Sequence, residues 1–142
     1  MAAQNSIVDR GNSWWFYVST SASGSKISFL RFPVSGYFGT VGSNTSIQTG
    51  VYTHVVGIYD TSVANEVKLY INGVLDREAS LDGPIKNITA AVTIGNRSGA
   101  HPFDGIIDDV RVSNIVRSAA WIKASYESGR NHFLDFGEEE AA

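Results

Sequence analysis

The sequence is 142 residues long, is 43% hydrophobic and 18% charged, and carries a formal net charge of -3. Its length suits one globular domain, and its acidic balance excludes the charge attraction that drives nucleic-acid binding. It contains no cysteine, which excludes disulfides and thiolate chemistry, and its apolar runs are far shorter than the roughly 18 residues that span a membrane. We therefore expect a globular chain that binds no nucleic acid and inserts into no membrane.

Short runs of β-branched and aromatic residues recur along the chain, separated by clusters of Gly, Asn, Ser and Asp. This pattern is typical of an all-β sandwich or barrel with many strands. We expect strands at 6–10, 14–19, 26–32, 37–41, 51–59, 66–72, 74–79, 91–95 and 105–113.

The clearest local pattern lies at 67–75, where alternating residues lead into Asn72-Gly73. This dipeptide tolerates the positive φ angles of a two-residue hairpin turn, so we expect a tight hairpin there. Because successive strand side chains point to opposite faces, Lys68 and Tyr70 are expected to face outward, and the apolar residues that flank them to face the core.

One helix is predicted, beginning after Ser118 and ending at Gly129. Serine is a favoured N-cap, and glycine commonly follows the last helical turn. Ile122 and Tyr126 are four residues apart and therefore share one helix face, which we expect to pack on a sheet.

Four segments follow one another in a characteristic order: 52–60 (YTHVVGIYD), 67–75 (VKLYINGVL), 93–97 (TIGNR) and 103–112 (FDGIIDDVRV). In this order they resemble the laminin-G-like branch of the concanavalin A-like lectin and glucanase superfamily. The resemblance implies an all-β jelly roll of two antiparallel sheets, each of about six or seven strands, with one short C-terminal helix. It places the domain at 1–137 and leaves an acidic tail at 138–142.

The amino end departs from this resemblance, because a typical member carries a further leading strand that pairs with the segment around 108–111. We expect the chain to be a truncated module or to be completed by another chain, since an uncovered sheet edge is a template for pairing. The segment 131–136 could fold back as a substitute strand or be donated to a neighbour. A homo-oligomer, or a place in a larger parent protein, is therefore expected.

Catalysis is not expected. Glycoside hydrolysis needs two carboxylates about 5–5.5 Å or 6.5–9.5 Å apart, and glucanases of the resembled fold place theirs in an alternating Glu-x-Asp-x-x-Glu stretch that this sequence lacks. His54, His101 and His132 are scattered, without the spacing of a zinc site. We predict that the protein is no enzyme and requires no cofactor.

The resemblance also implies a structural Ca²⁺ bound partly by a strand aspartate that matches Asp108, because hard oxygen ligands suit this ion. The alternative is that Asp108 only caps or hydrogen-bonds neighbouring backbone. Arg111 is expected on the solvent face, in an ion pair with Asp109.

Relatives of this fold bind carbohydrate with exposed aromatic side chains flanked by polar groups, on the concave face or on the loops at its edge. Strand alternation puts Trp15 and Tyr17 on the face opposite Trp14 and Phe16. The predicted ligand-binding residues are Trp15, Tyr17, Tyr37, Asn96, Arg97 and His101. The alternative is that the aromatic members of this set fill the core.

The function implied by the resemblance is a non-catalytic binding module, carbohydrate-binding or adhesive, of a secreted or cell-surface protein. Its partner would be a glycan or another surface ligand, and its location extracellular or on the cell surface, although no signal peptide follows Met1. The alternative is a structural subunit, such as a surface filament or virion decoration protein, that self-associates through the sandwich edges.

Overall fold

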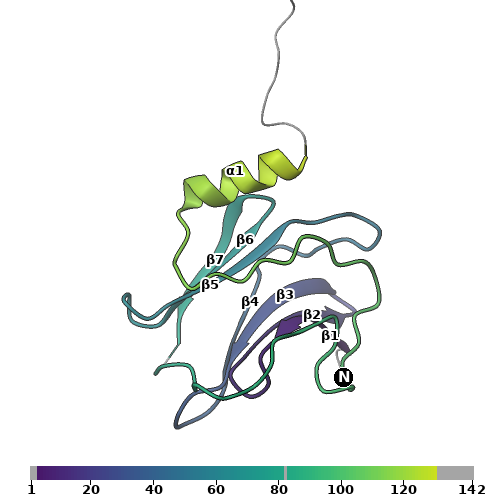
Figure 1. Ribbon diagram of the computed structural model, residues 1–142. Coiled ribbons are helices and arrows are strands. Elements are labelled where there is room, and N and C mark those ends of the chain that lie inside the picture. The colour runs from purple at the N-terminus through teal and green to yellow at the C-terminus, as the bar shows by residue number, and fades with distance from the viewer. Residues whose placement is uncertain (1–2, 82, 131–142) are drawn as a thin grey trace, which may run out of the picture.

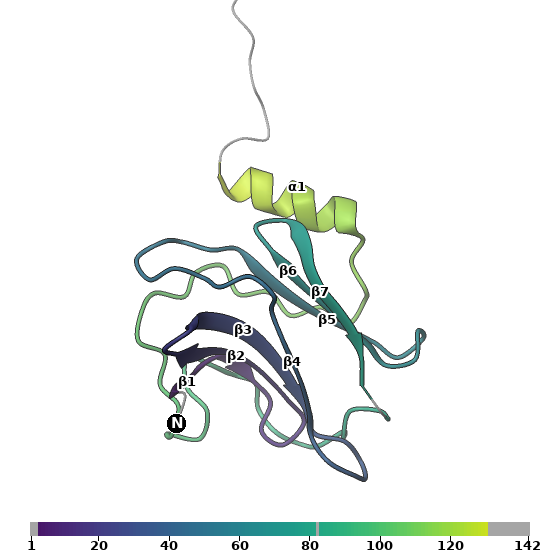
Figure 2. The same cartoon turned by 180° about the vertical axis from the view of Figure 1, so that it is seen from behind.

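The computed structural model describes residues 3–81 and 83–130. These residues form two facing sheets, with one helix lying over the smaller sheet (Figures 1 and 2). The strands and the helix are β1 (Ala3–Asp9), β2 (Trp14–Ser21), β3 (Gly24–Arg31), β4 (Gly39–Gly42), β5 (Val55–Asp60), β6 (Glu66–Ile71), β7 (Val74–Ser80), β8 (Thr93–Ile94) and α1 (Ala119–Gly129).

Both sheets are antiparallel. The larger has the strand order β4-β3-β2-β1-β8, and the smaller has the order β5-β6-β7. The predicted all-β, two-sheet fold with a C-terminal helix is therefore confirmed. Over the described ranges the sheets have five and three strands, fewer than the six or seven that the resemblance implied.

The apolar core lies between the two sheets. Phe29 and Val41 from the larger sheet pack with Val67 and Leu69 from the smaller one, and the last two side chains are fully buried. The sheets approach closely at Gly57, where a β-carbon would lie 3.2 Å from the Phe16 ring and 3.3 Å from that of Phe29. A side chain at residue 57 would push the sheets apart, so the core depends on glycine there.

The hairpin between β6 and β7 turns at Asn72-Gly73, as predicted, with φ angles of 52° and 77°. The prediction that Tyr70 faces solvent is wrong. Tyr70 does point away from the inter-sheet core, but it is buried in a second cluster with Ile58 and Ile122, because α1 covers this face. Alternation gives the direction of a side chain, and only the tertiary fold decides whether that face is covered.

The predicted helix is confirmed. The Ser118 hydroxyl accepts the N–H of Trp121 at 3.2 Å, which is the N-cap contact expected from the sequence. Ile122 of this helix is fully buried against Ile58 and Tyr70 of the smaller sheet. No helix in the described ranges is long and apolar enough to cross a membrane.

The predicted strand at 105–113 is wrong, because this segment is irregular in the structure. Asp109 has a φ of 48°, which interrupts an extended chain. The expected ion pair is confirmed: Arg111 Nη2 lies 2.7 Å from Asp109 Oδ2, and both side chains are exposed. The predicted substitute strand at 131–136 and the acidic tail at 138–142 lie outside the described residues.

A polar contact joins the loop after β4 to β7 of the other sheet. The Asp76 carboxylate accepts the N–H groups of Asn44 (2.6 Å) and Thr45 (2.9 Å), and Asn44 Nδ2 donates to the Asp76 carbonyl (2.7 Å). Partial burial pushes the pKa of Asp76 upward, but the hydrogen bonds from Thr45 and Asn44 outweigh it and hold the pKa below its usual value. We call this contact the Asp76 tie.

Candidate functional site

The face of the larger sheet that points away from the core carries a second set of aromatic side chains. Trp15 and Tyr17 lie on this face of β2, and their rings stack with centroids 4.1 Å apart. Trp15 Nε1 donates to the Ser6 hydroxyl of the neighbouring strand at 3.0 Å, so the indole N–H is satisfied although it is buried. This packing is separate from the inter-sheet core.

The segment 95–103 covers these rings. The Ser6 N–H donates to the His101 carbonyl at 3.1 Å, and the Gly95 N–H donates to the carbonyl of Ile7 at 2.9 Å, so the segment is fastened along β1. The His101 ring lies 4.8 Å from that of Trp15. We call Trp15, Tyr17, Arg97 and His101 the outer cluster.

Arg97 is the charged member of the outer cluster. Its Nε lies 3.2 Å from Asp9 Oδ2, an ion pair without the alignment of a hydrogen bond, in which the side chains are 18% and 3% exposed. The guanidinium also lies over the rings of Trp15 (4.7 Å) and Phe32 (5.2 Å). Its Nη2 donates to Asn12 Oδ1 at 3.2 Å. One side chain therefore connects β1, β2, the end of β3 and the turn between β1 and β2.

A depression of about 280 Å³ opens where these loops meet, and we call it the aromatic pocket. It is lined by Asn12, Phe32, Pro33, Gly36, Phe38 and Lys86. The rings of Phe32 and Phe38 lie 6.4 Å apart at 48°, and Phe38 is 65% exposed. Exposed apolar rings beside a few polar groups are what a small-ligand site requires.

Lys86 reaches the aromatic pocket because two hydrogen bonds hold its backbone. The Lys86 N–H donates to the Phe32 carbonyl at 2.8 Å, and the Ser13 hydroxyl donates to the carbonyl of Lys86 at 2.7 Å. In the part of the chain that the structure describes, no acidic side chain pairs with its ammonium group.

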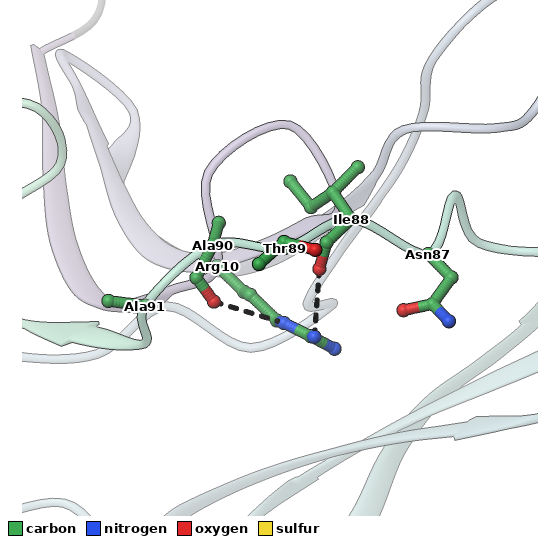
Figure 3. Close-up of a pocket in the computed structure, with 6 residues that line it drawn as sticks. All are labelled: Arg10, Asn87, Ile88, Thr89, Ala90 and Ala91. Carbon is green, nitrogen blue, oxygen red and sulfur yellow. Dashed lines mark hydrogen bonds between the residues drawn. The ribbon is translucent and has the colours of Figure 1, made fainter.

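Arg10 holds the residues that follow Lys86. Its Nη2 donates to the carbonyl of Ile88 at 2.9 Å and its Nε to that of Ala90 at 3.4 Å (Figure 3). A second depression, of about 470 Å³, lies at this contact and is lined by Arg10, Asn87, Ile88, Thr89, Ala90 and Ala91. Because its side chain donates to backbone carbonyls, Arg10 fixes the course of the segment that carries Lys86.

Four of the six predicted ligand-binding residues meet in the outer cluster. Trp15 and Tyr17 are only 2% and 4% exposed, so in this structure they support Arg97 and offer no free ring face. His101 is half-buried against Trp15. Ligand binding by these four side chains stays a prediction.

The other two predicted residues lie apart from the outer cluster. Asn96 is exposed, and its carbonyl accepts the Thr93 hydroxyl at 2.8 Å. Tyr37 is 94% exposed in the loop between β3 and β4, next to Phe38 of the aromatic pocket. Their roles in binding also remain predictions.

Sequence reasoning did not assign a role to Asn12 or Lys86 in this pocket. Asn12 lies between the predicted strands at 6–10 and 14–19, and Lys86 lies in a stretch for which neither a strand nor a helix is predicted. The available signal was Tyr37, a predicted ligand-binding residue adjacent in sequence to Phe38, although 37–41 was expected to be a strand and β4 begins only at Gly39.

The described residues contain no group of three His, Cys, Asp or Glu side chains that could hold a metal ion. Asp108 Oδ1 accepts the N–H of Asp109 at 2.9 Å, which agrees with the backbone-capping alternative but leaves calcium binding a prediction. A single carboxylate is too few donors for Ca²⁺, which takes six to eight oxygens.

His54 lies away from the pocket, with its ring 5.7 Å from that of Tyr126 under α1. Burial, and then the charge of Arg111, hold the pKa of His54 below its usual value. His132 lies outside the described residues. The histidines therefore do not converge on one site in the described ranges.

The two facing antiparallel sheets define a protein of the jelly-roll β-sandwich class. The family model described as the concanavalin A-like lectin/glucanases superfamily matches residues 1–123, and the chain belongs to this superfamily. The resemblance drawn from the four sequence segments is therefore confirmed.

Two solved structures share this fold. The Ruminococcus gnavus IT-sialidase CBM40 bound to alpha2,3 sialyllactose matches with a TM-score of 0.69 at 22% identity, covering 87% of this chain and 74% of that one. A second structure of the Ruminococcus gnavus IT-sialidase CBM40 matches with a TM-score of 0.68, with the same identity and coverage. A search among curated proteins found no significant match.

Proposed function

We propose that this chain is a non-catalytic carbohydrate-binding module of a secreted or cell-surface protein, and that its sugar ligand binds in the aromatic pocket. The observation that carries the proposal is the exposed ring of Phe38 beside Phe32, in a pocket that the polar residues Asn12 and Lys86 also line. Apolar ring faces accept the apolar face of a sugar, while the flanking donors meet its oxygens.

Superfamily membership and the likeness to a carbohydrate-binding module support the proposal. The structure with a TM-score of 0.69 holds alpha2,3 sialyllactose, so the same jelly roll can carry a glycan site. The proposal assigns no catalytic step to the chain, because its sequence lacks the alternating carboxylates of the related glucanases.

Glycan-array screening followed by calorimetry with α2,3-sialyllactose and lactose tests this function. Phe38→Ala should reduce affinity for the bound glycan at least about tenfold, as expected for the loss of a central aromatic contact. Tyr52→Ala is the matched control, because Tyr52 is an aromatic residue, 73% exposed, outside the pocket lining. The proposal fails if no glycan binds, or if both variants bind as the wild type does.

Self-association through a sandwich edge is a second candidate function. It is favoured by exposed apolar side chains on β8 and along the irregular segment that follows it, where Ile94, Ile106 and Val112 are 56%, 72% and 62% exposed. Apolar side chains beside a sheet edge favour pairing with another chain. Sedimentation at micromolar concentration tests it: Ile106→Asp should dissociate an oligomer, and a wild-type monomer at all concentrations contradicts it.

A further inference from the structure

The aromatic pocket offers hydrogen-bond donors on its polar side chains. A guanidinium group can only donate, so the Asn12 atom that lies 3.2 Å from Arg97 Nη2 must be its carbonyl oxygen Oδ1. The amide nitrogen of Asn12, with two N–H groups, is then left for a ligand. Lys86 adds an ammonium group, which also only donates.

The charged side chains around the pocket give it a net positive charge. Asp9 offsets the charge of Arg97, whereas Lys86 has no acidic partner among the described residues, and Arg10 donates to backbone carbonyls. No carboxylate is among the residues that line the pocket. A net positive site on a chain whose formal charge is -3 favours an anionic ligand.

Resting on the proposed function, we infer that Asn12 and Lys86 make the pocket specific for the carboxylate of an acidic sugar, and that Arg97 is the residue that positions Asn12. The pair of Arg97 with the buried carboxylate of Asp9 and its stacking on Trp15 hold the guanidinium in place. A fixed guanidinium keeps Oδ1 of Asn12 turned inward, so its N–H groups face the ligand. The buried outer cluster thereby sets the selectivity of an exposed pocket.

Asn12→Asp separates this inference from the proposed function. The substitution keeps the shape of the side chain and gives Arg97 a second carboxylate, so the melting temperature should stay the same or rise. The pocket, however, then presents an acceptor and a negative charge. Affinity for α2,3-sialyllactose should fall about tenfold or more, the effect of one lost charge-assisted hydrogen bond, whereas affinity for lactose, which has no carboxylate, should fall less, so the preference for sialyllactose is reduced.

Two further variants test the separate roles. Lys86→Gln should lower the preference for sialyllactose over lactose and remove part of its salt dependence. Arg97→Lys keeps the charge opposite Asp9 but loses the planar contact with Asn12, so the preference should fall although the charge is retained. A merely structural role of Arg97 would lower the affinities for both ligands equally and leave their ratio unchanged.

The outcomes are distinguishable. The inference is supported if the wild type binds α2,3-sialyllactose more tightly than lactose and if Asn12→Asp and Lys86→Gln each reduce this preference. Equal wild-type binding of the two sugars, or an unchanged ratio in the variants, overturns it while the binding function stands. Absence of binding to every glycan overturns the proposed function and this inference with it.

Discussion

Both faces of β2 carry aromatic side chains, but different interactions stabilise the two faces. On the inner face, Trp14 and Phe16 pack against a core of apolar residues. On the outer face, Trp15 stacks on Tyr17 and packs against His101 and the Arg97 ion pair. Inner packing is non-directional and depends on volume, whereas outer packing depends on the placement of a few charges. Small substitutions on the outer face should therefore alter selectivity as well as stability.

The largest expected effect is on the inner face. Leu69→Ala should lower the free energy of unfolding by about 3 kcal/mol, because it leaves a cavity in the fully buried core. Urea denaturation at low and high salt measures this, and the loss should be the same at both. A loss that changes with salt would show that the inner face is not purely apolar in its energetics.

A smaller loss is expected for the outer face when its charge is removed. Arg97→Met should cost about 2 kcal/mol, below the usual cost of breaking a buried pair because the Arg97 side chain keeps 18% of its surface exposed. The cost arises because Asp9 remains buried. The double variant Asp9→Asn with Arg97→Met should recover much of the loss, and strict additivity of the two single effects would contradict the ion pair.

The hydrogen bond between Trp15 Nε1 and Ser6 should contribute less. Trp15→Phe should cost about 1 kcal/mol beyond the loss of ring volume, because the Ser6 hydroxyl stays buried without this donor. A thermodynamic cycle with Ser6→Ala measures the coupling. No coupling between the two sites would mean that the contact does not stabilise the outer face.

Arg111 provides the exposed counterpart of Arg97. Its ion pair with Asp109 is short, at 2.7 Å, but the side chains are 59% and 65% exposed. Arg111→Ala should change the free energy of unfolding by less than about 0.5 kcal/mol. Thermal denaturation checks this. A loss of stability as large as that for Arg97→Met would show that the different burial of the two ion pairs does not determine their contributions to stability.

Local pattern predicted most of the strands because their cause is local. Alternation and Asn72-Gly73 define the β6–β7 hairpin without knowledge of any other part of the chain. The segment 105–113 is at least as rich in β-branched residues, yet it is not a strand. A strand requires a hydrogen-bonded neighbour, and composition cannot supply one.

The aromatic pocket could be predicted only in part, because its walls come from distant segments. Alternation correctly separated Trp15 and Tyr17 from Trp14 and Phe16, but it could not tell that residues 95–103 cover the first pair. Likewise, the contact between Asn12 and Arg97 joins residues 85 positions apart. Such contacts depend on how the loops meet at the end of the sheet. The alternation of residues along a strand does not predict how distant loops meet.

Hydrogen–deuterium exchange can report local separation of the two sheets at the Asp76 tie. The amides of Asn44 and Thr45 are bonded to a carboxylate of the opposite sheet, so they exchange only when the layers part locally. Since the folded pKa of Asp76 lies below its usual 3.8, the stability from this contact is present above that pH. It is lost as the pH falls through the folded value. Lowering the pH should therefore separate the two sheets first at this end of the sandwich. The amides of Asn44 and Thr45 should be the first to show faster deuterium exchange.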